Sequence, residues 1–344
     1  MPRKPDADHI EAFVDELAAR LASGELVTSP WPECPRYLFH LTQIENVPSI
    51  LRSRCLFSRN RLIELDLPMA ENASPAIIEQ TLPFIHDHVR LYFRPKTPTF
   101  ARNEGIRATS EIWRGAHMPV PVAFILRAKP ILCEQGVRFS DGGLARAKGF
   151  RIRSEAWFLK KLPFEVIYND SPSALDQDVL TFHRQAEVIV PGELPLEGLI
   201  WRIGVRSSAE FDTLRTQLRD HLAEEADRWM RDVEVDPGTR WFFKRWTYVE
   251  WVKGFPDRLD LAFHASTQPQ GFDVTWRFRD GASDVLSEGR TRLLAKGSYT
   301  FPLPLVVRNR PYRFTMYLDD HLAYDGTFDS STAYSLIGRA DPPV

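Results

Sequence analysis

The sequence predicts an α+β protein that ends in a C-terminal antiparallel β-sandwich. In residues 1–236, stretches with helical spacing of apolar residues alternate with short apolar runs rich in β-branched and aromatic side chains. Beyond Pro237 and Gly238, the pattern changes to short stretches of alternating polarity separated by turn residues, which is typical of a sandwich. We therefore expect two domains, residues 1–236 and 237–344, and assign the second to binding or assembly.

The composition excludes several classes of protein. The 344 residues suffice for two domains, and the net charge of −2 means that a nucleic-acid role would depend on a local basic patch. Cys34, Cys55 and Cys133 form no CxxC pair, which favours a reducing cytoplasm. The chain has no apolar signal core and no run long enough to cross a membrane, so we expect a cytoplasmic protein without a membrane partner. His86 and His88 lack a third ligand, and we expect no metal site.

The first elements predict a packing helix and then a strand that leads into a helix. Residues 8–23 have helical periodicity, with Asp8 as the expected cap. Residues 37–42 form an aromatic strand, and residues 44–54 a helix. His40, Thr42 and Asn46 then meet at a strand-to-helix turn, which offers donors to a polar ligand. The simpler interpretation of His40 is a hydrogen-bonded core histidine.

Basic residues gather in two later segments. The strand expected at 89–93 leads into a proline-restricted turn that carries Arg94 and Lys96. After another strand at 120–126, cations far outnumber acidic residues up to residue 164, and the densest part is a glycine-containing loop at 138–153. Its cations are interleaved with Phe139 and Phe150, as in a groove for a single-stranded nucleic acid. A solvated basic loop is the alternative in both segments. The expected nucleic-acid contacts are Arg138, Arg146, Lys148, Arg151 and Arg153.

One carboxylate stands at the start of a core strand. In residues 181–191, a polar cluster runs into Glu187, which is followed by Val188, Ile189 and Val190. A carboxylate at that position is costly unless it has partners or a task. Either an ion pair with Arg184 or another base, or a catalytic role, would account for it.

The remaining elements complete the first domain and build the sandwich. A strand at 199–205 precedes an amphipathic helix that begins at Ser207 and Ser208. The strands expected in the sandwich are 241–246, 258–265, 272–279, 298–305, 313–318 and 322–328.

Four motifs resemble the DarT-type nucleic-acid ADP-ribosyltransferases over roughly residues 35–205. The first is His40-x-Thr42, followed by Asn46-x-Pro-x-Ile-Leu. The others are Tyr-Phe-Arg-Pro-Lys-Thr-Pro at 92–98, Phe-Ser-Asp-Gly at 139–142, and Arg-Gln-Ala-Glu at 184–187. Each is weak alone, but their order and spacing are fairly specific. The C-terminal sandwich lies outside this resemblance.

The resemblance implies an ADP-ribosyltransferase-like split β core with helices that binds NAD. The implied reaction attaches ADP-ribose to a base of single-stranded DNA or RNA and releases nicotinamide, commonly as the toxin of a toxin–antitoxin or phage-defence pair. By motif, His40, Leu41, Thr42 and Asn46 would hold NAD as co-substrate, and Glu187 would be the catalytic glutamate. An antitoxin or defence protein is the implied partner.

One motif departs from the family pattern. The usual Pro-Arg-x-Pro is here Pro-Lys-Thr-Pro at 95–98, and lysine lacks the bidentate fork of arginine. We expect Arg94 to take the catalytic role with Lys96 assisting. The departure puts thymidine as the target in question, since related enzymes modify guanine and some act on RNA. Two other functions stay open: a non-catalytic module that binds single strands, and an ADP-ribosyltransferase that acts on protein.

Overall fold

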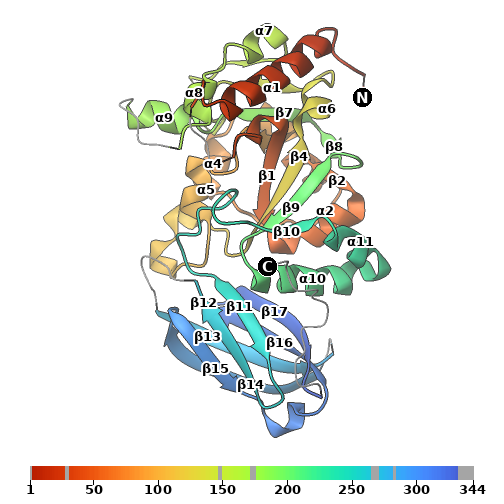
Figure 1. Cartoon of the computed structure of the whole chain (residues 1–344), viewed down its shortest axis with the longest axis vertical. Coiled ribbons are helices and arrows are strands. Elements are labelled where there is room, and N and C mark those ends of the chain that lie inside the picture. Colours follow the sequence, from red (N-terminus) through yellow and green to blue (C-terminus); the bar gives the residue numbers. More distant parts are fainter. Residues whose placement is uncertain are drawn as a thin grey trace.

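The computed structural model describes residues 2–27, 31–145, 149–170, 176–264, 271–281 and 284–331. Helices surround a large sheet in the N-terminal part, and two smaller sheets form a separate lower body (Figure 1). Mixed helices and sheets followed by antiparallel sheets confirm the α+β prediction.

Eight strands form the large sheet, which is antiparallel except where its first two strands pair in parallel. In spatial order they are β10 (Val233–Val235), β9 (Ile200–Val205), β4 (Pro121–Arg127), β1 (Tyr37–Gln43), β3 (His88–Tyr92), β7 (Glu187–Pro191), β5 (Arg138–Ser140) and β6 (Ile152–Arg153). A separate ribbon pairs β2 (Cys55–Phe57) with β8 (Glu193–Pro195).

The large sheet is split between its two central strands. β1 pairs along its whole length with β4, but it shares a single registered pair with β3, Phe39 with Tyr92. Beyond that pair the two strands diverge, so Leu41 and Arg90 are not paired. The split β core expected from the resemblance is therefore present, and it opens a gap in the middle of the sheet.

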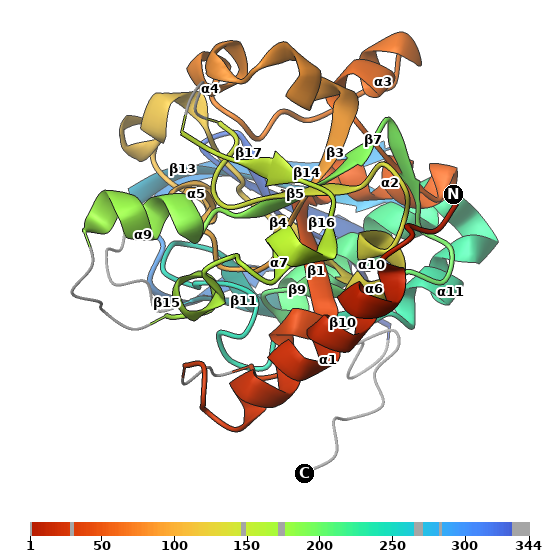
Figure 2. The ribbon, with the colours of Figure 1, turned by 90° about the horizontal axis from the view of Figure 1, so that it is seen from above.

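Helices cover both faces of this sheet. α1 (Ala7–Ala22) buries Ile10, Phe13, Val14 and Leu17, which confirms the predicted stripe, although its N-cap is Asp6 instead of Asp8 and makes no side-chain cap. In the view from above, α1 lies on one side of the strands, and α3 and α4 on the other (Figure 2). The remaining α-helices are α2 (Val47–Ser53), α3 (Arg59–Glu64), α4 (Pro75–Gln80), α5 (Pro98–Asn103), α6 (Ala128–Leu132), α7 (Ala156–Leu159), α8 (Phe164–Ile167), α9 (Gln177–His183), α10 (Ser208–Leu222) and α11 (Ala226–Met230).

The lower body is a sandwich of two antiparallel sheets, as predicted. One sheet has the order β11 (Val249–Gly254), β12 (Arg258–Phe263) and β15 (Gly297–Pro302). The other has the order β14 (Asp284–Leu294), β13 (Gly271–Asp280), β16 (Pro311–Leu318) and β17 (His321–Asp329). Apolar residues of both sheets share one core, which gives an immunoglobulin-like form in general terms.

One strand prediction in this region was wrong, and two strands were not predicted. Residues 241–246 form no strand, because Trp241 and Phe242 are buried in the core of the N-terminal part. The many aromatic residues in this segment reflect burial in a core, and not an extended strand. The sequence reading also missed β11 and the edge strand β14, whose exposed charged residues hide its alternation. The regular sheets of the sandwich thus begin at Val249, and not at Pro237.

Candidate active site

Glu187 begins β7 and is almost completely buried, at 1% exposure. Arg90 on the neighbouring strand β3 binds it with two bonds, Nε to Oε2 at 2.6 Å and Nη2 to Oε1 at 2.7 Å. The backbone N–H of Leu144 donates a third bond to Oε1 at 2.9 Å. Such a bidentate pair compensates for the cost of removing the carboxylate from water.

The pair reflects the alternation of the two strands. Tyr92 lies directly opposite Glu187, and Arg90 is two residues from Tyr92, so all three side chains share one face of the sheet. Burial lowers the pKa of Arg90, but the adjacent Glu187 carboxylate raises it by more, and the guanidinium stays charged. Burial, reinforced by Glu187, raises the pKa of Tyr92 to about 12.

A tight turn after β5 brings the third donor into place. The hydroxyl of Ser140 accepts a bond from the Glu187 N–H at 3.0 Å and lies 2.7 Å from the carbonyl of Gly142, to which it can donate. A Cβ on Gly142 would lie 2.3 Å from the ring of Phe182. Only glycine therefore lets this turn approach α9 closely enough to aim the Leu144 N–H at Glu187. This explains the Phe-Ser-Asp-Gly motif.

A first hollow, of about 230 Å³, contains all four residues expected to hold NAD: His40, Leu41, Thr42 and Asn46. The Asn46 amide donates to Thr42 Oγ1 and to the Ala70 carbonyl, both at 3.0 Å, and accepts from the Ala70 N–H at 2.7 Å. Asn46 therefore fixes the loop that borders the hollow. Burial lowers the pKa of His40, so its ring is neutral, and its Nδ1 lies 3.3 Å from the Arg90 carbonyl.

A second hollow, of about 470 Å³, adjoins the first and contains Glu187, Tyr92 and Gln185. Leu41 and Arg90 line both hollows. These are the two residues at which β1 and β3 diverge. The Arg90 side chain is 30% exposed and lines both hollows while its guanidinium holds the carboxylate. The split in the sheet thus places a buried carboxylate and a partly open cation where two hollows meet.

Three buried side-chain oxygens at the second hollow have no hydrogen-bond partner among the described residues: Asn72 Oδ1, Ser74 Oγ and Asn103 Oδ1. Buried polar atoms in folded proteins usually have partners. The residues that carry these three oxygens all line the second hollow.

The structure does not bring Arg94 and Lys96 to Glu187. β3 ends at Tyr92, so strand alternation no longer aims the following side chains at the hollow. Arg94 is buried, donates to the Ile167 carbonyl at 2.7 Å, and forms an ion pair with Asp170. Lys96 Nζ lies 3.0 Å from the same carboxylate, and neither cation lines the two hollows.

Three of the five predicted nucleic-acid contacts, Arg138, Arg151 and Arg153, lie near the β5–β6 edge of the large sheet, beyond β7. Arg138 contacts the Nε2 of His88 at 2.7 Å, and Arg151 binds Asp141 at 2.7 Å while its side chain is 71% exposed. Arg153 bonds the carbonyl of its neighbour Ile152 and is exposed. Arg146 and Lys148 lie outside the described residues.

Arg90 is the partner of Glu187 that the sequence did not indicate. Its signal was a single cation inside the apolar run Val-Arg-Leu-Tyr-Phe at 89–93. A buried carboxylate requires a cation, and Arg90 supplies it; the partner suggested from the sequence was Arg184 or another base. Arg90 comes from a strand 97 residues away in the chain.

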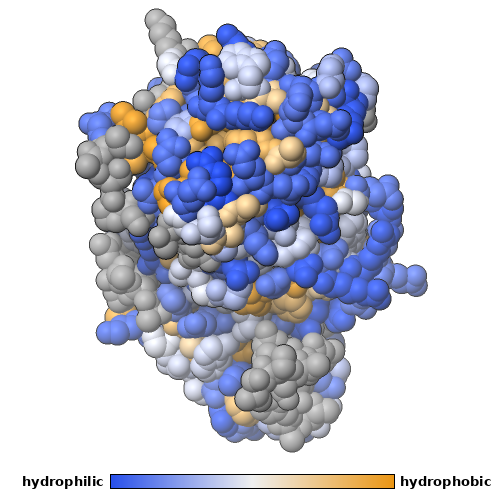
Figure 3. Space-filling model, turned by 45° about the horizontal axis from the view of Figure 1, so that its top comes forward, coloured by the Kyte–Doolittle hydropathy of each residue, from blue (hydrophilic) through white to orange (hydrophobic). Residues whose placement is uncertain are grey.

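The remaining expectations concern metals, cysteines and membranes. Among the described residues, no group of three or more His, Cys, Asp or Glu side chains could hold a metal ion. Cys34, Cys55 and Cys133 are buried and free. No helix in the described ranges is long and apolar enough to cross a membrane. On the face seen in Figure 3, hydrophilic residues dominate and apolar ones show in small areas.

A sequence model described as "ssDNA thymidine ADP-ribosyltransferase, DarT" matches residues 39–243. The chain belongs to the DarT family. It is therefore an ADP-ribosyltransferase that uses NAD as co-substrate, as the motifs implied.

Solved DarT structures are similar to this chain at low identity. Thermus sp. 2.9 DarT with ADP-ribosylated ssDNA is 21% identical over 61% of this chain and 97% of its own, with a TM-score of 0.45. The complex of Thermus sp. 2.9 DarT with NAD+ is 21% identical over 61% of this chain and 98% of its own, with a TM-score of 0.41. Thermosipho africanus DarTG with ADP-ribose gives 18% identity, 60% and 51% coverage, and a TM-score of 0.46. No curated protein matches the chain.

Proposed function

We propose that this DarT-family enzyme transfers ADP-ribose from NAD to a base of single-stranded DNA at the junction of the two hollows. The observation that carries the proposal is the Arg90–Glu187 pair. It is buried and bidentate, yet Arg90 lines both hollows and Glu187 lines the second. A carboxylate and a guanidinium at the meeting point of two spaces are well placed to act on two substrates.

The reaction requires that one bond break and another form at the same carbon. The bond between nicotinamide and C1′ of the ribose breaks, and a bond from a base nitrogen to C1′ forms. The base loses a proton, so the products are ADP-ribosylated base, nicotinamide and H⁺. Positive charge develops on the ribose as nicotinamide leaves, and the Glu187 carboxylate stabilises it or accepts a bond from a ribose hydroxyl.

Arg90 has two tasks in this scheme. Its two bonds hold the Glu187 carboxylate in one orientation, which is the preorganisation that electrostatic catalysis needs. Because the Arg90 side chain is partly exposed and lines both hollows, its positive charge also stabilises negative charge on the pyrophosphate or on a base that is losing its proton. Arg90 thus takes the place that the sequence reading gave to Arg94 and Lys96, which instead neutralise Asp170.

We assign NAD to the first hollow and the target base to the second. The first hollow has the His-x-Thr motif and the Asn46-held loop, with a neutral His40 between β1 and β3. The second contains Glu187, together with unpartnered oxygens that suit the N–H groups of a base. A base must leave its stack to enter, which favours a single strand. The basic β5–β6 edge would guide the phosphates.

The direct test is to incubate the protein with NAD labelled in its adenine and with separate pools of single-stranded DNA, RNA and protein. The proposal predicts label in the DNA pool and an equimolar release of nicotinamide. Label confined to RNA would move the target to RNA, and label confined to protein would support the protein-modifying alternative. A folded protein that labels no pool contradicts the proposal.

The sequence also left open a non-catalytic module that binds single strands. Its support in the sequence was Lys96, but that side chain pairs with Asp170 and lines neither hollow. The identity of residue 96 therefore says little about catalytic competence. This candidate predicts salt-sensitive binding of an oligonucleotide without any release of nicotinamide from NAD.

We also propose that an antitoxin or defence partner protein restrains the enzyme in its cell. Modified bases in single-stranded DNA obstruct replication, so an unrestrained enzyme would harm the cell that makes it. Expression of the chain alone should arrest growth, whereas a Glu187→Gln variant expressed to the same level should not. Equal growth of the two strains would contradict a toxic activity.

A further inference from the structure

One wall of the second hollow consists of two short segments that bond to each other, residues 102–106 and 116–118, here called the wall segments. Arg102, Asn103, Ala116 and Met118 line the hollow. The Met118 N–H donates to the Asn103 carbonyl at 2.7 Å, and the Gly105 N–H donates to the Met118 carbonyl at 2.9 Å. The position of this wall therefore depends on the position of residues 103–106.

The sandwich holds the far end of this wall. Ile106 is 1% exposed and belongs to the apolar core of the sandwich, although it lies in the N-terminal part of the chain. Its N–H donates to the Thr247 carbonyl at 2.9 Å, immediately before β11. At Gly105, a Cβ would lie 2.6 Å from the Cβ of Trp246, and φ is +86°. The wall and the entry to the sandwich are therefore in direct contact.

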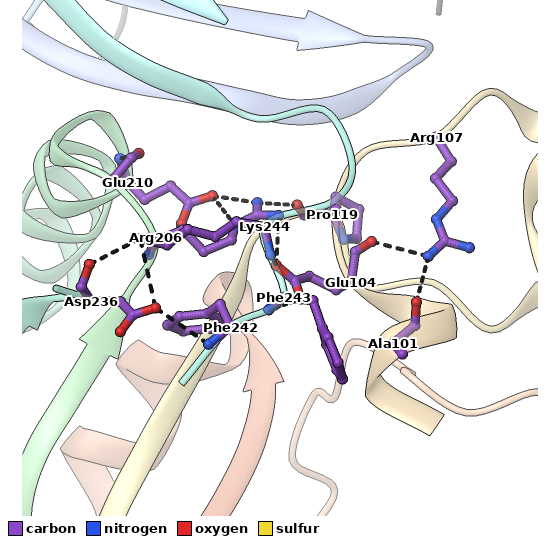
Figure 4. A network of polar contacts seen from close by, with 12 residues as sticks. Ala101, Glu104, Arg107, Pro119, Arg206, Glu210, Asp236, Phe242, Phe243 and Lys244 are labelled. Carbon is purple, nitrogen blue, oxygen red and sulfur yellow. Dashed lines mark hydrogen bonds and ion pairs between the residues drawn. The ribbon is translucent and has the colours of Figure 1, made fainter. Parts of the chain in front are cut away.

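A buried carboxylate fixes the same contact (Figure 4). Glu104 is fully buried and accepts bonds from the Phe243 N–H at 2.8 Å and the Lys244 N–H at 2.9 Å. Arg206, also fully buried, lies 3.9 Å from Glu104 and pairs with Glu210. Its Nη2 donates to the Pro119 carbonyl at 2.7 Å, next to Met118. Both wall segments are thereby tied to the residues that lead into the sandwich.

The sandwich itself sits firmly on α10. The Ser207 hydroxyl donates to the Val249 carbonyl at 2.7 Å, and Arg313 Nη1 lies 2.7 Å from an oxygen of Asp220. Ala209 of α10 belongs to the sandwich core. His117 of the wall also contacts His321 of β17, with ring centroids 4.4 Å apart. These contacts on several sides leave the sandwich little freedom to move against the wall.

We propose that the sandwich is a clamp that positions the base-binding wall, and that Glu104 and Ile106 are its positioning residues. The inference rests on the assignment of the target base to the second hollow. Asn103 lines the second hollow and is adjacent to Glu104, so a shift at the clamp moves a residue of the base site. Displacement by a fraction of a bond length is enough to weaken a positioned contact.

The test compares Ile106→Ala with Leu261→Ala. Both residues are fully buried in the sandwich core, but Leu261 on β12 pairs in register with Val252 of β11 and Tyr299 of β15, inside the sandwich. We expect similar losses of Tm. Ile106→Ala alone should raise the KM for a single-stranded oligonucleotide about tenfold, with kcat and the KM for NAD near wild type. Hydrogen exchange should quicken at the amides of Gly105 and Met118 in Ile106→Ala and not in Leu261→Ala.

Glu104→Gln serves as a second variant of nearly the same size, in case Ile106→Ala does not fold. It should show the same rise in KM and the same faster exchange. Unchanged KM and unchanged exchange in a folded variant would overturn the clamp. If the wild-type chain transfers nothing to DNA while the exchange pattern follows the prediction, the proposed function fails and the clamp stands.

Discussion

Two buried arginine–carboxylate pairs differ in how they are enclosed. Arg206 and Glu210 are both essentially unexposed, and protein surrounds them at the junction with the sandwich. Arg90 and Glu187 are bonded as closely, but the Arg90 side chain is 30% exposed and lines two hollows. The fully enclosed Arg206–Glu210 pair can only stabilise the fold, whereas the partly exposed Arg90–Glu187 pair can also contact substrates. Removing one partner should therefore have opposite consequences at the two places.

Glu187→Gln is the substitution with the largest expected effect on activity. It keeps the size of the side chain but removes the charge that stabilises the developing cation, so kcat should fall about 1,000-fold or more. The Tm should change little, because Arg90 reaches solvent and can be hydrated. Steady-state release of nicotinamide, with circular dichroism as the control for folding, measures both. A retained kcat would refute the role of Glu187.

Glu210→Gln should give the opposite result. It leaves the fully buried Arg206 without its closest charge, which is expected to lower the free energy of unfolding by about 3–5 kcal/mol. At saturating NAD and DNA, kcat per folded molecule should stay within about threefold of wild type, since the clamp governs KM. Urea unfolding measures the first quantity. An undiminished stability would show that the two pairs do not differ as described.

The junction should also give the molecule a dependence on pH. Burial lowers the pKa of His117 to about 4, below its ordinary 6.5. Between pH 6.5 and about pH 4, His117 is therefore protonated in the unfolded chain but neutral in the folded chain. Stability is therefore full above pH 6.5 and decreases as pH falls toward 4, by about 2–3 kcal/mol from this residue. His117→Gln should flatten that part of the curve in urea titrations at a series of pH values. If the slope of stability against pH is the same in His117→Gln and wild type, His117 is not the source of the pH dependence.

Arg90→Lys should have an intermediate effect that sharpens the role of the open pair. Lysine keeps the charge but cannot make both bonds to Glu187, so kcat should fall about 10- to 100-fold. Arg94→Lys is the matched control, because it makes the same substitution at an arginine that bonds Asp170 and lines neither hollow. Its kcat should remain near wild type. A larger loss in Arg94→Lys than in Arg90→Lys would restore the original assignment.

The smallest expected effect concerns the exposed edge of the sheet. Arg153→Ala removes one exposed cation, which should weaken oligonucleotide binding only a few-fold and lower the slope of log K against log salt by about one. Fluorescence anisotropy at several salt concentrations measures this slope. No change in slope would remove Arg153 from the DNA path.

Local patterns predicted many individual elements of the fold, but they predicted the site less well. The stripe of α1, the apolar strand after Glu187 and the alternation of β13 each follow from the residues of one element. The His-x-Thr turn and Glu187 were found because motifs mark them. Arg90 was missed because its partner lies on another strand, and Arg94 was chosen because the end of β3 at Tyr92 cannot be read from alternation alone. The clamp at Ile106 depends on contacts across the whole chain.

The central claim is tested most directly by nucleoside mass spectrometry of a single-stranded DNA pool incubated with NAD. Wild-type protein and Glu187→Gln are compared at equal folded concentration. The account predicts a nucleoside that carries ADP-ribose with the wild type, identifies its base, and predicts almost none with the variant. Equal amounts of modified nucleoside in both samples, or none with active wild-type protein that still consumes NAD, would contradict it.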